Sequence, residues 1–222
     1  MNNSEAILLL EDGSTFRGQS IGIKGSSVGE VVFNTSMTGY QEIITDPSYD
    51  SQIITFTNPH IGNTGVNSED MESLKIHASG IIIRDIGVSS NSWRKTDTLP
   101  NYLKNNSIIA ISGIDTRKLT KVLRTTGSQN GCIMAGEIDL DSAKEQIKNF
   151  NGLDGKDLAK KVTTNEVYPW KEGLVDIYHR HAQKKNERSF KVVAYDFGIK
   201  HNILRILEGH GCELTIVPAD YS

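Results

Sequence analysis

Two cysteines are the residues of this chain best suited to nucleophilic chemistry. A cysteine nucleophile on a strand-to-helix turn needs small neighbours on both sides, as in Gly-x-Cys-x-Gly. Around Cys132 the run is Gly131-Cys132-Ile133-Met134-Ala135-Gly136, with misplaced glycines and apolar residues after the thiol. Cys212 follows Gly211 where another predicted strand begins. We predict that both cysteines are structural and that they form no disulfide.

The histidines show little sign of a metal site. His179 and His181 are a close pair, but no carboxylate or cysteine cluster accompanies them. We therefore predict a solvated patch there and no metal site. The tripeptide Asp196-Phe197-Gly198 resembles a kinase metal-binding motif, yet the other kinase motifs are missing upstream. We predict a turn that ends a strand, where it could border a ligand crevice.

Ser48 lies in the sequence Asp46-Pro47-Ser48-Tyr49. Spacing alone favours an ordinary turn, because Asp46 can accept backbone hydrogen bonds and Pro47 fixes φ. A serine hydroxyl also donates and accepts hydrogen bonds, which suits an amino-acid ligand. The residues by themselves leave the second interpretation open.

A basic helix face is the remaining candidate site. Residues 116–125 place apolar side chains on one face, and the other face carries Arg117, Lys118, Lys121 and Arg124. Such a face is either simply solvated or a docking surface for an acidic partner.

The elements that would position these residues change along the chain. We predict strands at 6–10, 15–21, 28–34, 52–57, 78–84, 108–112 and 130–136, and helices at 38–45, 99–104, 116–125 and 142–150. Asp12-Gly13 predicts a hairpin turn. Asp115 and Asp141 are the predicted caps of the last two helices, and Gly127 the stop of the first of these. The alternation predicts a layered β/α N-terminal domain over residues 1–152.

The rest of the chain divides into a linker and a second structural unit. Residues 153–190 predict an extended linker that includes a Tyr168-Pro169-Trp170 turn. Residues 191–222 predict a β-α-β unit: strand 191–195, a helix over 199–208 and strand 213–217. Its predicted apolar stripe is Ile203, Leu204 and Leu207. Two strands and one helix cannot cover themselves, so we expect either a fragment or a sheet that another chain completes.

Composition excludes several classes of protein. The 222 residues suffice for one or two domains, and the net charge of −3 with a pI of about 6.1 argues against nucleic-acid binding. No apolar run is long enough to span a membrane, and the first residues do not resemble a signal peptide. We expect a cytoplasmic protein.

Seven stretches resemble the small subunit of carbamoyl-phosphate synthase. They are residues 10–13 (LEDG), 29–42 (GEVVFNTSMTGYQE), 45–49 (TDPSY), 58–63 (NPHIGN), 114–120 (IDTRKLT), 129–132 (QNGC) and 193–200 (VAYDFGIK). The resemblance runs from about residue 6 to the last residue, and the block over 31–49 is highly specific.

The resemblance implies an N-terminal β/α domain followed by a class I glutamine amidotransferase domain of flavodoxin-like fold, of which residues 191–222 would be the truncated start. That domain hydrolyses glutamine with a Cys–His–Glu triad. The ammonia passes to a large subunit that makes carbamoyl phosphate from bicarbonate and ATP, so ATP and Mg²⁺ are expected on the large subunit and no cofactor in this chain. The resemblance also implies that Ser48 helps to bind glutamine.

The resemblance therefore predicts the glutamine amidotransferase chain of this ligase, with glutamine and the large subunit as partners. We find no counterpart of the triad, so we expect the chain alone to be inactive. The alternative is a non-catalytic docking or regulatory module that binds the large subunit.

Overall fold

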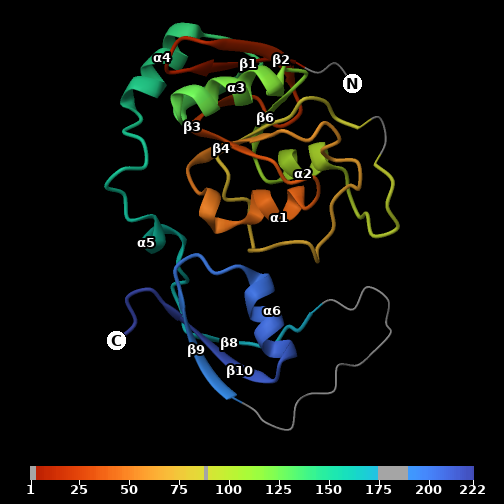
Figure 1. Cartoon of the computed structure of the whole chain (residues 1–222), viewed down its shortest axis with the longest axis vertical. Helices are drawn as coiled ribbons and strands as arrows, with labels where there is room; N and C mark the ends of the chain where they lie inside the picture. Colours follow the sequence, from red (N-terminus) through yellow and green to blue (C-terminus); the bar gives the residue numbers. More distant parts are fainter. Residues whose placement is uncertain (1–3, 88–89, 175–189) are drawn as a thin grey trace.

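The computed structural model describes residues 4–87, 90–174 and 190–222. The described chain forms two units, a larger one built around a closed barrel and a smaller one with its own sheet (Figure 1). An extended segment leads from one to the other (Figure 1). None of the described helices is long and apolar enough to cross a bilayer.

Seven strands form the barrel. They are β1 (Glu5–Leu10), β2 (Thr15–Ser20), β3 (Gly25–Asn34), β4 (Gln52–Phe56), β5 (Gly80–Ile82), β6 (Ile109–Ser112) and β7 (Gln129–Ala135). The order around the sheet is β1-β2-β6-β5-β4-β3-β7, and the sheet closes. The pairs β3-β4, β4-β5 and β5-β6 are parallel, and the other pairs of neighbouring strands in the barrel are antiparallel. The α/β class is thus confirmed, but the sheet of this unit closes into a barrel, and the layered arrangement that the sequence predicted for it is not found.

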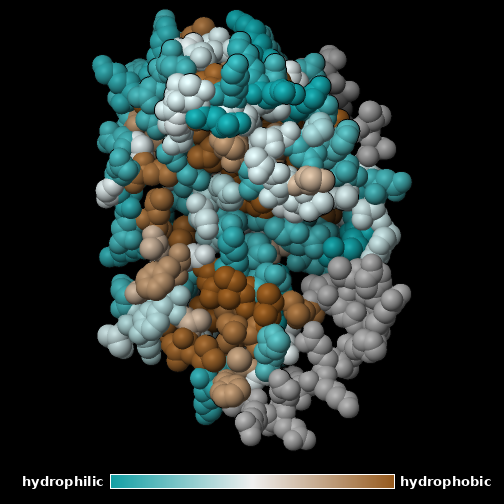
Figure 2. All heavy atoms as spheres, viewed as in Figure 1, coloured by the Kyte–Doolittle hydropathy of each residue, from teal (hydrophilic) through white to brown (hydrophobic). Residues whose placement is uncertain are grey.

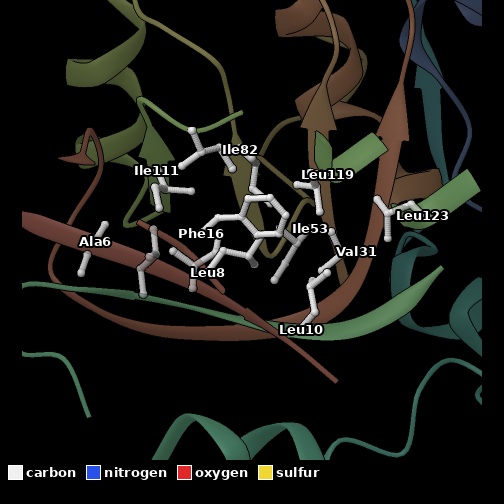
Figure 3. Close-up of a cluster of buried hydrophobic side chains, with 14 residues drawn as sticks. Ala6, Leu8, Leu10, Phe16, Val31, Ile53, Ile82, Ile111, Leu119 and Leu123 are labelled. Atoms are coloured by element: carbon white, nitrogen blue, oxygen red, sulfur yellow. The ribbon is translucent and has the colours of Figure 1, made fainter. Parts of the chain in front are cut away.

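The barrel is filled by alternating side chains from several strands. Figure 3 shows Phe16 of β2 among inward-facing residues of β1, β3, β4, β5 and β6. In a barrel every second residue of a strand points inward, so Ala6, Leu8 and Leu10 of β1 share this core. The opposite face of β1, with Ile7 and Leu9, packs in a second buried cluster outside the barrel core. Both faces of the strand are therefore buried, which explains why the whole run from 6 to 10 is apolar.

Helices cover the barrel from outside. They are α1 (Tyr40–Thr45), α2 (Leu99–Asn105), α3 (Thr116–Thr126) and α4 (Leu140–Asn149), and a 3₁₀ turn, η1 (Pro47–Tyr49), follows α1. Leu119 and Leu123 of α3 join the barrel core (Figure 3). Ala143 and Ile147 of α4 pack on the outer face of β1 and β7.

The two predicted helix caps have different outcomes. Asp115 caps α3 as predicted, because its Oδ1 accepts a hydrogen bond from the Lys118 N–H at 2.9 Å. The cap of α4 is Asp139 and not Asp141, which the sequence predicted. Asp139 has an extended backbone and accepts hydrogen bonds from the N–H groups of Asp141 and Ser142, so the helix begins two residues earlier.

The predicted linker contains regular structure. A short helix, α5 (Leu158–Val162), precedes a strand, β8 (Tyr168–Trp170), where the sequence predicted a turn. The strand β8 pairs antiparallel with β10 (Cys212–Pro218), so the turn prediction is wrong. Proline is tolerated in β8 because this strand lies at the edge of its sheet. The proposed domain boundaries at 152 and 190 stay predictions.

The smaller unit confirms the predicted β-α-β arrangement. Strands β9 (Phe190–Asp196) and β10 pair in parallel, with helix α6 (His201–Gly209) between them in sequence, and the sheet order is β8-β10-β9. Leu204 of α6 is fully buried against Leu214 and Ile216 of β10. Ile203 was expected in the same stripe but is 49% exposed, because it points away from this cluster.

Candidate functional site

The candidate site begins with the turn that carries Ser48. Helix α1 ends at Thr45, and Asp46 has an extended backbone, as a residue before proline prefers. Oδ1 of Asp46 accepts a hydrogen bond from the Ser48 N–H at 2.9 Å. The predicted turn is confirmed, and the aspartate and the proline fix it as the sequence indicates.

The Ser48 side chain is exposed on this turn. Its neighbours are held firmly, because Pro47 is buried and the Tyr49 hydroxyl accepts a hydrogen bond from the Asn34 amide at 2.9 Å. Within the described residues the Ser48 hydroxyl makes no hydrogen bond of its own. The hydroxyl is therefore positioned by a rigid turn and free to bind a ligand.

A second loop lies directly against this turn. It follows β9 and is shaped by Asp196, which is buried and whose Oδ1 accepts hydrogen bonds from the N–H groups of Gly198 and Ile199 at 2.9 and 2.8 Å. Its Oδ2 accepts another from the Thr164 N–H at 2.7 Å. The prediction that this tripeptide is a turn at the end of a strand is confirmed.

Glycine at position 198 permits the two loops to touch. Gly198 has φ +91°, and a Cβ atom there would lie 3.1 Å from Cβ of Pro47 and 2.8 Å from Cγ2 of Val162. A side chain would thus be strained by the backbone and would push the loops apart. Ser48 consequently lies next to the carboxyl end of a parallel strand, a place where α/β sheets often bind ligands.

Ion pairing joins the same two loops. Nζ of Lys200 lies 2.6 Å from Oδ2 of Asp46, whose side chain is 8% exposed. The hydrogen bond to Asp46 raises the pKa of Lys200, so the lysine stays charged. One carboxylate therefore shapes the Ser48 turn with one oxygen and binds the smaller unit with the other.

The first turn of α6 is anchored on the barrel unit. The Glu72 carbonyl accepts from the His201 N–H, and its carboxylate accepts from the Asn202 N–H, both at 2.9 Å. A carboxylate at a helix N-terminus is favoured by the helix dipole. Arg205 adds a hydrogen bond to the Met71 carbonyl at 3.1 Å. These contacts fix the orientation of α6 relative to the barrel.

A cavity of about 680 Å³ lies where the two units meet. The barrel unit contributes Pro47 and His77 to its lining, and the smaller unit contributes Asp196 and His201. Burial lowers the pKa of both histidines, with Lys75 adding to the effect at His77 and Arg205 at His201. Both rings are thus kept neutral more strongly than in water.

Cys132 is not placed as a nucleophile. Cys132 is fully buried in β7, and burial raises the pKa of its thiol to about 11. The thiolate is therefore scarce at neutral pH. Cys212 is half-buried at the start of β10. The prediction that Cys132 is a core residue is confirmed.

The remaining candidates are dispersed. His179 and His181 lie outside the described residues. In the part of the chain that the structure describes, no three His, Cys, Asp or Glu side chains gather as potential metal ligands. The basic face lies on the solvent side of α3, as predicted.

Comparison with known proteins assigns the family. Residues 8–133 match the family model described as "Carbamoyl-phosphate synthase small chain, CPSase domain". The chain is 57% identical over 219 residues to a carbamoyl phosphate synthase small chain from Thioalkalivibrio sulfidiphilus, covering 99% of this chain and 58% of the relative. It is 56% identical over 220 residues to the protein of that name from Escherichia coli, covering 98% and 58%.

The chain belongs to the carbamoyl-phosphate synthase small-chain family. It spans about 58% of the length of these relatives. A solved aminopeptidase from Aneurinibacillus sp. strain AM-1 aligns with a TM-score of 0.36 and 13% identity, too weak a likeness to inform fold or function.

The long-range ion pairs of the candidate site could not be predicted from the sequence. Asp46 was recognised as a turn former, but its ion pair with Lys200 links positions far apart in the chain. The same holds for Asp50, which lies 2.6 Å from Nζ of Lys161 and 4.0 Å from Nδ1 of His77. No local pattern predicts such pairs, because they depend on how distant parts of the chain pack.

Proposed function

We propose that this chain functions as the N-terminal portion of the small, glutamine-handling chain of carbamoyl-phosphate synthase. That chain would supply ammonia from glutamine to a large subunit, where ATP and Mg²⁺ are used to make carbamoyl phosphate from bicarbonate. Membership in the family supports the proposal. The parallel pairing of β9 and β10 around α6 supports the related proposal that residues 191–222 belong to a flavodoxin-like amidotransferase domain.

The observation that carries the proposed glutamine site is the position of Ser48. Its hydroxyl is exposed and stands on a fixed turn, and Gly198 brings that turn against the loop at the carboxyl end of β9. A hydroxyl there can accept from the ammonium group of an amino acid or donate to its carboxylate. Ser48 would therefore bind and orient glutamine and take no part in bond breaking.

Substitution of Ser48 tests this role in the complete small chain assembled with its large chain. Ser48→Ala removes one hydrogen bond to the ligand, so glutamine-dependent synthesis should need about tenfold more glutamine. Ammonia-dependent synthesis should be unchanged, because ammonia bypasses the site. Ser128→Ala is the matched control, since Ser128 is an exposed serine that bonds to Glu30 on the barrel. Equal loss with both nitrogen donors would refute the assignment.

A non-catalytic docking module remains the second candidate for this chain by itself. The burial of Cys132 and its raised pKa favour it, because this thiol lacks the setting of a nucleophile. We expect no ammonia release from glutamine when this chain is mixed with the large chain. Release that Cys132→Ser abolishes would show that the buried thiol acts as a nucleophile after all.

A further inference from the structure

The outer face of α3 concentrates positive charge. Arg117, Lys121 and Arg124 are exposed at helical spacing i, i+4 and i+7, so they form one row along the helix. Leu119 and Leu123 occupy the opposite side in the barrel core, which forces the cations outward. Hydrophilic side chains cover this region in Figure 2, at the place where Figure 1 shows α3.

A groove of about 730 Å³ runs beside this row. Its other lining residues include Thr57, which follows β4, and Arg84, which follows β5. The strands β4 and β5 are parallel neighbours, so their carboxyl ends meet at one edge of the barrel. That edge is the usual ligand-binding side of parallel strands. The groove is thus lined both by the charged face of α3 and by the carboxyl ends of two parallel strands of the barrel.

In the part of the chain that the structure describes, the cations that line the groove have no acidic partner. Across residues 4–87, 90–174 and 190–222, no ion pair involves Arg84, Arg117, Lys121 or Arg124. Asp115 also lines the groove, but its carboxylate is used to cap α3. The chain as a whole carries a net charge of −3, so this positive surface is a local concentration and not a general property.

The spacing of the charges indicates the kind of ligand. A helix rises about 1.5 Å per residue, so the backbone positions of Arg117 and Arg124 are roughly 10 Å apart along α3. A compact anion such as phosphate would need the cations to converge on one point. A row suits several carboxylates on one polypeptide, since acidic side chains one helical turn apart are about 6 Å apart along the axis.

We propose that this groove, lined by α3 and the ends of β4 and β5, docks an acidic segment of the large chain. The identity of the partner rests on the proposed function, whereas the acidic chemistry rests on the groove. The charges would steer the approach of the two chains and fix their register. Because the groove is open to solvent, the attraction should weaken as salt screens it.

The test is the affinity between this chain and the large chain, measured by calorimetry. Arg117→Glu/Lys121→Glu should weaken binding about tenfold or more. Position 117 lies in the first turn of α3, where the helix dipole favours an acidic side chain, and position 121 is exposed at the middle of the helix, so the helix should stay folded. Circular dichroism checks this. The control, Lys104→Glu/Lys148→Glu, reverses two exposed lysines on α2 and α4 and should bind normally.

Salt and a glutamate-rich peptide complete the test. Raising NaCl from about 0.05 to about 0.5 M should weaken the binding of the unsubstituted chain much more than that of Arg117→Glu/Lys121→Glu. The peptide should bind the unsubstituted chain and the control, but not the charge-reversed variant. Pyrophosphate binding without peptide binding would mark a compact-anion site and overturn the proposal.

Two further outcomes separate this proposal from the proposed function. Normal affinity in Arg117→Glu/Lys121→Glu would overturn the docking surface and leave the small-chain role intact. Failure of the unsubstituted chain to bind the large chain would overturn both.

Discussion

In the barrel, strand β1 buries five consecutive residues, and in the smaller unit, strand β9 exposes alternate residues from Lys191 to Tyr195. Residues 6–10 are at most 4% exposed, whereas Val193 and Tyr195 are 60% and 47% exposed. The strand β1 has the barrel core on one side and α4 on the other. In the described chain α6 covers one face of β9, and the other face carries Val193 and Tyr195 into solvent.

The same apolar composition therefore has different consequences in the two units. The barrel completes its core with residues of this chain, but the smaller unit exposes apolar surface on its sheet and on α6, where Ile203 and Ile206 are 49% and 40% exposed. Figure 2 shows hydrophobic side chains gathered over the region of α6. Stability should consequently reside in the barrel, and the junction should decide how firmly the smaller unit is held.

The largest expected effect comes from the barrel core. Ile53 is fully buried among the residues of Figure 3, so Ile53→Ala should lower the free energy of unfolding by about 2–5 kcal/mol through lost burial and a residual cavity. Urea unfolding measures the change. Val193→Ala removes a side chain of similar size from the exposed face of β9 and should cost no more than about 0.5 kcal/mol. Equal losses would mean that the two units do not differ as described.

An intermediate effect is expected at the junction. Gly198→Ala combines a positive φ with close contacts to Pro47 and Val162, so it should cost about 1–3 kcal/mol in local stability. Faster hydrogen exchange in α6, with the barrel unchanged, would report that the smaller unit has loosened.

Gly155→Ala is the matched control for this junction variant. Gly155 also has a positive φ, +73°, but a Cβ atom there would meet nothing within 4 Å. The difference between the two variants isolates the contact between the loops from backbone strain. If both variants loosen α6 equally, Gly198 does not hold the junction together.

Local chemistry could be predicted from the sequence, and pairing over long distances could not. The Asp12-Gly13 turn, the Asp115 cap and the turn at Asp46 each depend on a few adjacent residues, and all three are present. At α4 the sequence predicted Asp141 as the cap, and the extended backbone at Asp139 places the cap two residues earlier.

Closure of the barrel illustrates what local patterns leave undetermined. It requires β1 to pair with both β2 and β7, which is a property of strand order that hydrophobic periodicity does not encode. The strand β8 was missed for the same reason, because its partner β10 lies more than forty residues further along the chain. At the candidate site, the sequence predicted the Ser48 turn, whereas its contact with Gly198 emerged only from packing.

The smallest expected effect concerns pH at the junction. Burial lowers the pKa of His77 and of His201, which line the same cavity from different units. For His77, Lys75 lowers the pKa further, while Asp50 and Asp46 act in the opposite direction. Below the ordinary histidine pKa of about 6.5 the unfolded chain therefore binds more protons than the folded chain. The contribution of these two histidines to the free energy of unfolding is greatest above that pH. It declines as the pH falls toward their pKa values in the folded state.

Neutral substitutions test the direction of this effect. His77→Gln and His201→Gln should each flatten the loss of stability between about pH 7 and about pH 5.5, because glutamine has no proton to gain. Urea unfolding at both pH values gives the difference, and comparison with the unsubstituted chain cancels the contribution of carboxylates. NMR titration of the His77 ring provides a direct check. If His77 titrates at or above its ordinary pKa, the junction is more hydrated than its buried contacts indicate. The proposed difference between a well-packed barrel and a loosely held smaller unit would then not apply at the junction.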